Sequence, residues 1–252
     1  METYAAVVLA GGSARRMGGV DKPALPVGGR SMRDRVLAAV SDATPRVLVG
    51  PAEEVPEGVR VTREDPPGGG PVAATAAGLA LLDPDTALVA LLAADLPLLT
   101  RAAIGDLLTH LTGDNPDAAH AGQGAAHAGQ GAAHAGQGAA HAGQGAALAG
   151  GGSPSVPMVG TGLVGRERPD GACFVDGDGR RQSLCGVWRV AALRAALDRL
   201  TVERGGRLSG AAVRALLAGL VVREVPWSGD GPPPWFDCDT DEDVRRAEEW
   251  AR

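Results

Sequence analysis

Cationic and acidic side chains stand where the chain leaves several predicted strands. Residues 9–22 read LAGGSARRMGGVDK and place two arginines and Lys22 among four glycines. Carboxylates follow later apolar runs, at Asp65 and at Asp95. Glycine lets backbone N–H groups approach a ligand closely, and lysine and arginine pair with phosphate oxygens. The loop at 9–22 is therefore typical of a site that holds a polyphosphate.

The glycine loop follows neither of the commonest phosphate-binding spacings. A P-loop has Lys-Ser/Thr directly after its last glycine, whereas Val20 and Asp21 precede Lys22 here. The G-x-G-x-x-G spacing of dinucleotide-binding folds is also absent. A glycine-rich surface turn with solvated basic residues is the alternative interpretation. The whole string favours a nucleoside-triphosphate cradle at the carboxyl end of a first strand.

The string from Leu9 to Lys22 resembles the signature of the MobA-like nucleotidyltransferases, the family of the molybdenum cofactor guanylyltransferases. The resemblance extends over about residues 1–113 and 170–250. It implies a single α/β domain with a Rossmann-like nucleotidyltransferase fold and a mostly parallel sheet flanked by helices. It also implies a Mg²⁺-dependent transfer of GMP from GTP to the terminal phosphate of molybdopterin, with release of pyrophosphate. A transferase that uses CTP or another phosphorylated acceptor, and a non-catalytic nucleotide- or cofactor-binding protein, are the alternatives.

The resemblance also implies roles for individual residues. Those that would be catalytic are Arg16, Lys22 and Asp95. Those that would contact the nucleotide are Leu9, Ala10, Gly11, Gly12, Lys22, Asp65 and Asp95. Mg²⁺ would be held by Asp95 and by a second carboxylate, Asp239 or Asp237, because this cation prefers one or two carboxylates together with phosphate oxygens.

Several of these roles have a structural alternative, and for Asp95 it is a helix N-cap, although Thr100 is better placed for that. Arg16 alone could be a solvent-facing arginine, and the segment around Asp65 could be a plain loop that starts a helix. Asp239 lies just before Thr240, which with the acidic residues after it could simply cap the last helix.

One position departs from the family pattern. Many guanylyltransferases of this family have Asn just after the second strand, near the base, whereas this chain has Gly50 and Pro51. The choice between GTP and CTP is therefore less well defined by the sequence than nucleotidyl transfer itself.

Repeated βα units must position these residues. Short apolar runs predict strands, and longer amphipathic stretches predict helices. A strand buried on both faces ends directly before Asp95, at the edge where open α/β sheets bind ligands. The predicted strands are 4–9, 46–49, 58–61, 86–92 and 220–225, with a hairpin of 172–175 and 181–188. The predicted helices are 31–40, 71–82, 100–111, 190–200, 208–218 and a last one from Thr240.

Residues 120–147 are four identical copies of the heptad HAGQGAA. The heptad lacks large apolar residues, so it predicts neither a coiled coil nor a packed core. A His-rich metal-binding tract is the alternative, because four of the five histidines lie here. We expect a low-complexity insertion at about 115–168 that interrupts one nucleotidyltransferase domain spanning 1–252.

Composition excludes several other classes of protein. The net charge of −6 argues against a nucleic-acid partner. The absence of a long apolar run argues against a membrane span, and the chain starts without a secretory signal. Three widely spaced cysteines fit buried thiols better than disulfides or zinc. We expect a cytoplasmic enzyme that binds GTP and molybdopterin, with a cofactor-delivery protein or molybdoenzyme as a further partner.

Overall fold

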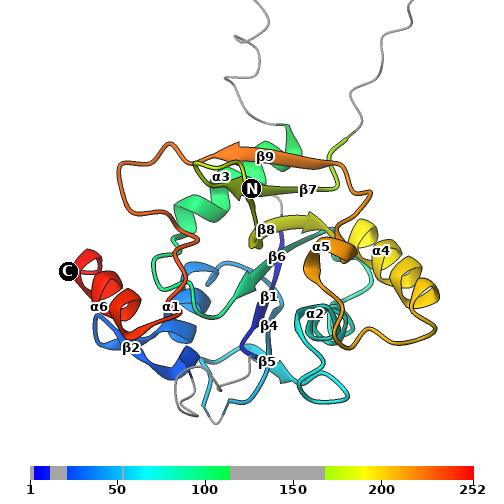
Figure 1. Cartoon of the computed structure of the whole chain (residues 1–252), viewed down its shortest axis with the longest axis horizontal. Coiled ribbons are helices and arrows are strands. Elements are labelled where there is room, and N and C mark those ends of the chain that lie inside the picture. Colours follow the sequence, from blue (N-terminus) through cyan, green and yellow to red (C-terminus); the bar gives the residue numbers. More distant parts are fainter. Residues whose placement is uncertain (1–2, 12–21, 53, 114–167) are drawn as a thin grey trace, which may run out of the picture. The chain divides into compact units, whose positions relative to one another are not determined.

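The computed structural model describes residues 3–11, 22–52, 54–113 and 168–252. Its centre is a seven-stranded sheet with the order β5-β4-β1-β6-β8-β7-β9 (Figure 1). Strand β8 runs antiparallel to both of its neighbours, and the other pairings are parallel. The prediction of an α/β fold with a mostly parallel sheet is confirmed.

The strands of this sheet agree closely with the apolar runs of the sequence. In chain order they are β1 (Ala5–Leu9), β4 (Arg46–Val49), β5 (Val59–Thr62), β6 (Leu88–Ala93), β7 (Gly171–Val175), β8 (Arg181–Arg189) and β9 (Val222–Pro226). Strand β1 is buried at every position. Its two parallel neighbours, β4 and β6, explain why β1 carries apolar residues without alternation.

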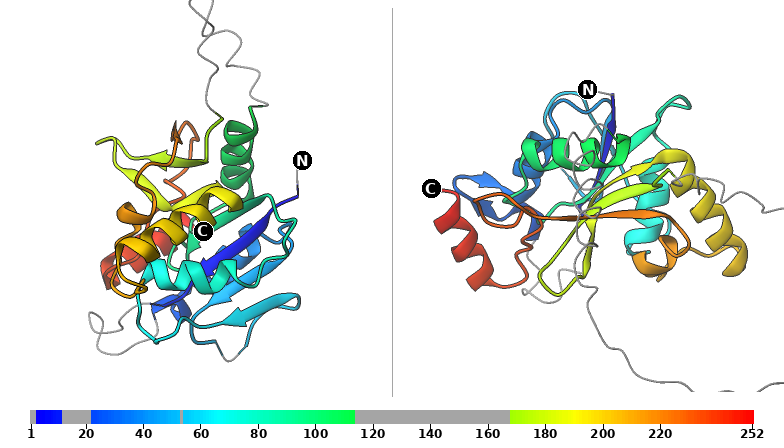
Figure 2. Two further views of the ribbon diagram at one scale, coloured as in Figure 1. Left: turned by 90° about the vertical axis from the view of Figure 1, so that its right-hand side faces the viewer. Right: turned by 90° about the horizontal axis from the view of Figure 1, so that it is seen from above.

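Helices cover both faces of the sheet, as Figure 2 shows from two sides. One core cluster joins α1 (Met32–Ala39) and α3 (Arg101–Thr112) to one face. A second cluster joins α2 (Pro71–Leu79), α4 (Val190–Glu203) and α5 (Val213–Leu216) to the other. The last helix, α6 (Asp241–Trp250), packs with α1 and the short strand β2 (Pro26–Val27) in a third cluster.

Helix starts follow the capping residues that the sequence offers. Thr100 accepts a hydrogen bond from the Ala103 amide at the start of α3, and Pro71 is the first residue of α2. Thr240 and Asp243 form a reciprocal capping box at the start of α6. The predicted role of Thr240 as a cap is therefore confirmed.

Two local predictions differ from the structure. The helix expected over 208–218 is only the single turn of α5, because Gly210 has a φ of 72° and Ala212 is still extended. After the short helix η2 (Lys22–Ala24), strands β2 and β3 (Arg30–Ser31) form a small hairpin that the sequence reading did not include. Gly28 and Gly29, both with positive φ, make its turn.

The repeat segment and the predicted insertion at about 115–168 lie almost entirely outside the described residues. Within the part of the chain that the structure describes, no helix is both long and apolar enough to cross a membrane. All three cysteines are free and buried, as expected.

Candidate nucleotide and metal site

The candidate site lies at the carboxyl ends of the parallel strands. Leu9 closes β1, and its carbonyl accepts the Ala94 amide at 3.0 Å, which ties it to the strand that precedes Asp95. The Ala10 amide donates to the Val49 carbonyl at 2.8 Å. Both side chains are buried, so Leu9 and Ala10 fix the path of the backbone that leads into the glycine loop. Gly11 is exposed at the start of that loop.

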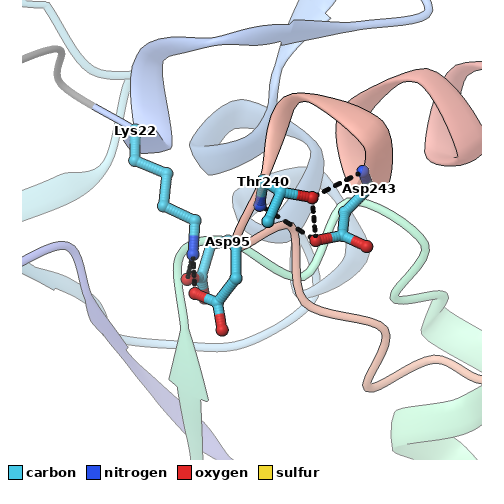
Figure 3. Close-up of polar contacts among 5 residues, drawn as sticks. Lys22, Asp95, Thr240 and Asp243 are labelled. Carbon is cyan, nitrogen blue, oxygen red and sulfur yellow. Dashed lines mark hydrogen bonds and ion pairs between the residues drawn. The ribbon is translucent and has the colours of Figure 1, made fainter. Parts of the chain in front are cut away.

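Lys22 joins two carboxylates from distant parts of the chain (Figure 3). Its Nζ donates to Oδ2 of Asp95 and to Oδ1 of Asp239, each at 2.7 Å. The side chains of Lys22 and Asp95 are 20% and 25% exposed, whereas that of Asp239 is 57% exposed. The structure thus brings together three residues that the sequence placed in one site.

The electrostatics of this cluster are dominated by negative charge. Partial burial lowers the pKa of Lys22, but its hydrogen bonds to Asp239 and Asp95 outweigh that effect, so the pKa lies above its ordinary value. Desolvation raises the pKa of Asp237, and the charges of Asp239 and Asp95 raise it further. Lys22 therefore contacts two carboxylates, and the negative charge of both also acts on Asp237.

A buried cysteine anchors the segment that carries Asp239. Cys238 is fully buried against Val27, Met32, Leu98 and Ala247, and its amide donates to the Asp95 carbonyl at 3.4 Å. Burial raises the pKa of the Cys238 thiol to about 12, so the group is an uncharged thiol at neutral pH. Cys238 therefore holds the two carboxylate-bearing loops side by side and supplies no nucleophile.

The donor set around Asp95 suits a hard divalent cation. Oxygens of Asp95 and Asp239 converge on one positive charge, the Lys22 ammonium. Mg²⁺ takes one or two carboxylates and completes its shell with water and phosphate oxygens. Among the described residues, no group of three or more histidine, cysteine or acidic side chains could hold a metal ion. The two carboxylates fit a shared metal–phosphate site rather than an all-protein cage.

The backbone around Gly50 leaves no room for a larger residue. Its φ is 145°, and a Cβ at this position would lie 2.8 Å from the Ala10 carbonyl carbon. The first turn after β4 therefore packs directly on the backbone after β1. An asparagine, which the family pattern has near this point, would not fit here without movement of that backbone.

The remaining predicted residues divide into two groups. Asp65 is exposed in the loop between β5 and α2. Gly12 and Arg16 lie outside the described residues.

Sequence reasoning passed over one residue of this region, Glu64. Its side chain is buried, although Arg63 and Asp65 on either side are exposed. The apolar residues Val59 and Val61 alternate in the opposite phase, so the sequence pattern points to Asp65 and carries no signal that selects Glu64.

Comparison with known proteins gives several matches. A molybdenum cofactor guanylyltransferase from Bradyrhizobium sp. (strain ORS 278) is 36% identical over 126 residues. That match covers 47% of this chain and 59% of the curated relative, so the chain spans less than two thirds of the relative's length.

Solved structures share the fold. Molybdopterin-guanine dinucleotide biosynthesis protein A from Archaeoglobus fulgidus matches with a TM-score of 0.56 at 18% identity, over 97% of each chain. The 2-C-methyl-D-erythritol 4-phosphate cytidylyltransferase from Francisella tularensis matches with a TM-score of 0.58 at 10% identity, over 100% of each chain. At such identities the likeness concerns the fold alone. The model of the MobA-like NTP transferase domain matches residues 6–219, and the chain belongs to this family.

Proposed function

We propose that this protein is a nucleotidyltransferase that transfers GMP from GTP to the terminal phosphate of molybdopterin. The observation that carries the proposal is the contact of Lys22 with Asp95 and Asp239 at the carboxyl ends of β1 and β6. The family to which the chain belongs and the name of its Bradyrhizobium relative support it. The products would be the guanine dinucleotide form of the cofactor and pyrophosphate.

In this reaction an oxygen of the acceptor phosphate forms a bond to the α-phosphorus of GTP. The bond from the α-phosphorus to the bridging oxygen breaks, and pyrophosphate leaves with the electron pair. The protein needs no side-chain nucleophile, so its task is to hold two anionic substrates in line and to neutralise their charge. Lys22 would bind phosphate oxygens, and backbone N–H groups of the loop that begins at Gly11 would cradle them.

Asp95 and Asp239 would hold Mg²⁺, which when bound neutralises phosphate charge and polarises the α-phosphoryl group. The Lys22 ammonium lies between these carboxylates, so it must give up at least one of the two contacts when it turns to the triphosphate. Arg16, for which the family resemblance implies the same role, would also bind the triphosphate. Asp65 would contact the nucleotide from the loop before α2, and a cytoplasmic location accords with the proposed substrates.

Pyrophosphate release with separate nucleotides tests this function. The full chain is incubated with molybdopterin, Mg²⁺ and either GTP, CTP or ATP, and pyrophosphate and the dinucleotide product are quantified. We expect both products with GTP. Equal or greater product with CTP would contradict the assignment of GTP, and nucleotide binding with no product in any mixture would favour a non-catalytic binding protein.

A further inference from the structure

A small polar pocket lies between α1 and the loop that joins β6 to α3, and none of the roles above uses it. The pocket has a volume of about 210 Å³. Its lining residues are Arg30, Arg35, Ala38, Ala39, Pro97 and Leu99. Two of them carry a guanidinium group and none carries a carboxylate, although the chain as a whole has a net charge of −6. The pocket is therefore a local concentration of positive charge.

The guanidinium of Arg35 is held in place by neutral acceptors. Its Nε donates to the Pro97 carbonyl at 2.7 Å, and its Nη1 donates to the Val27 carbonyl at 3.3 Å. Within the described residues no carboxylate forms an ion pair with Arg35, and its Nη2 donates to no acceptor. The two backbone carbonyls orient the planar group without neutralising its charge, so Arg35 is a preorganised donor for an anion.

The second guanidinium, that of Arg30, comes from the small hairpin of β2 and β3. Arg30 is exposed, and it forms no ion pair within the part of the chain that the structure describes. Its register partner in the hairpin is Val27, the residue whose carbonyl accepts Nη1 of Arg35. One strand pair therefore brings both arginines to the same pocket, from positions five residues apart in the sequence.

The rest of the pocket wall provides space but no competing polar side chain. Arg35, Ala38 and Ala39 lie on one face of α1, because residues three and four positions apart are neighbours on a helix. The two alanines end in methyl groups, so the volume that a longer side chain would fill stays open. Pro97 and Leu99 are buried apolar residues. The side-chain donors of the pocket are therefore the two guanidinium groups alone.

We propose that this pocket binds a phosphate dianion, either inorganic phosphate or one end of pyrophosphate. Phosphate oxygens match the forked donors of a guanidinium, and two guanidinium groups balance the charge of a dianion. A carboxylate carries a single charge and would leave one arginine unbalanced. The pocket contains none of Lys22, Asp95 and Asp239, so this anion site lies outside the proposed transfer site and does not depend on the transfer reaction.

Titrations of the ¹⁵N-labelled full chain, followed by NMR at constant ionic strength, test this proposal. Above the second pKa of phosphate, the amide signals of Ala38 and Leu99 should shift with a Kd on the order of 1 mM. Acetate should bind there at least about tenfold more weakly. The amides of Gly11 and Asp95 report separately on the transfer site. Phosphate shifts confined to those two amides, or equal affinities of the pocket for acetate and phosphate, would overturn the proposal.

The same titration with pyrophosphate distinguishes the two sources of the dianion. A pocket affinity about tenfold or more above that for phosphate assigns the site to pyrophosphate, and an equal or lower affinity assigns it to inorganic phosphate.

Two variants change the pocket in different ways. Arg30→Gln removes one guanidinium at an exposed position and should weaken phosphate binding in the pocket about tenfold, with the response of Gly11 and the melting temperature unchanged. Ala38→Glu keeps both arginines but places a carboxylate in the pocket, which should abolish phosphate binding there. The charge-matched control is Arg223→Gln, an exposed position on β9, which should keep the wild-type affinity. Wild-type phosphate affinity in either pocket variant, or an equal loss in Arg223→Gln and Arg30→Gln, would overturn the proposal.

Discussion

Replacement of Lys22 by methionine should remove two ion pairs of unequal strength, a stronger one with Asp95 and a weaker one with Asp239. Both ion pairs have the same 2.7 Å length, but Asp95 is 25% exposed and Asp239 is 57% exposed. Exposed pairs contribute about 0.2–1 kcal/mol because water and salt screen them. We therefore expect a coupling free energy of about 1 kcal/mol for Lys22 with Asp95, and about 0.3 kcal/mol for Lys22 with Asp239.

Two double-mutant cycles measure these energies. They combine Lys22→Met with Asp95→Asn and with Asp239→Asn, and urea unfolding is followed by circular dichroism at pH 7. Both coupling energies should shrink in 1 M NaCl. The pKa of Lys22 is raised in the folded protein, so its pairing is fully present below the ordinary pKa of 10.5 and is lost as the pH rises through the raised value. Equal coupling energies, or energies that salt does not change, would refute this reasoning.

Three further predictions concern the scaffold. Gly78→Ala should lower the free energy of unfolding by about 1–3 kcal/mol, because its Cβ would lie 2.4 Å from a Val7 methyl; unchanged urea unfolding would contradict this packing. Thr240→Ala should cost about 1 kcal/mol at pH 7. The Thr240 hydrogen bond lowers the pKa of Asp243. Part of the cost of Thr240→Ala should therefore vanish in thermal melts as the pH falls from 3.8, the ordinary pKa, through the lowered pKa of Asp243. A cost that does not change with pH would argue against this cap. Replacement of residues 115–167 by a short Gly-Ser linker should leave activity and melting temperature nearly unchanged, since we expect an appendage there; a large loss of either would show that the segment belongs to the domain.

Much of the fold could be predicted because its signals are local. Uninterrupted apolar runs marked β1 and β6 as buried parallel strands, and Thr100, Pro71 and Thr240 marked helix starts. The failure over 208–218 has a local cause as well, because its apolar spacing looked helical while Gly210 takes a left-handed conformation. The sequence reading also missed β2 and β3, which are too short to show periodicity.

The candidate site was only partly predictable for a different reason. The carboxylates of Asp95 and Asp239 could be named from motifs, but their contact with one ammonium depends on the burial of Cys238 among distant apolar residues. Likewise, the steric need for glycine at position 50 arises from its packing on Ala10, forty residues away. Such long-range packing leaves no mark in the local sequence.

The central claim is that the carboxylate of Asp95 serves nucleotidyl transfer at this edge of the sheet. Its most direct test compares wild type with Asp95→Asn in single-turnover assays with GTP, molybdopterin and Mg²⁺, and measures GTP affinity for both by calorimetry. We predict that Asp95→Asn abolishes formation of the dinucleotide product while it retains much of the GTP binding, because Lys22 and the backbone around Gly11 remain. Product formation by Asp95→Asn at the wild-type rate would contradict the account.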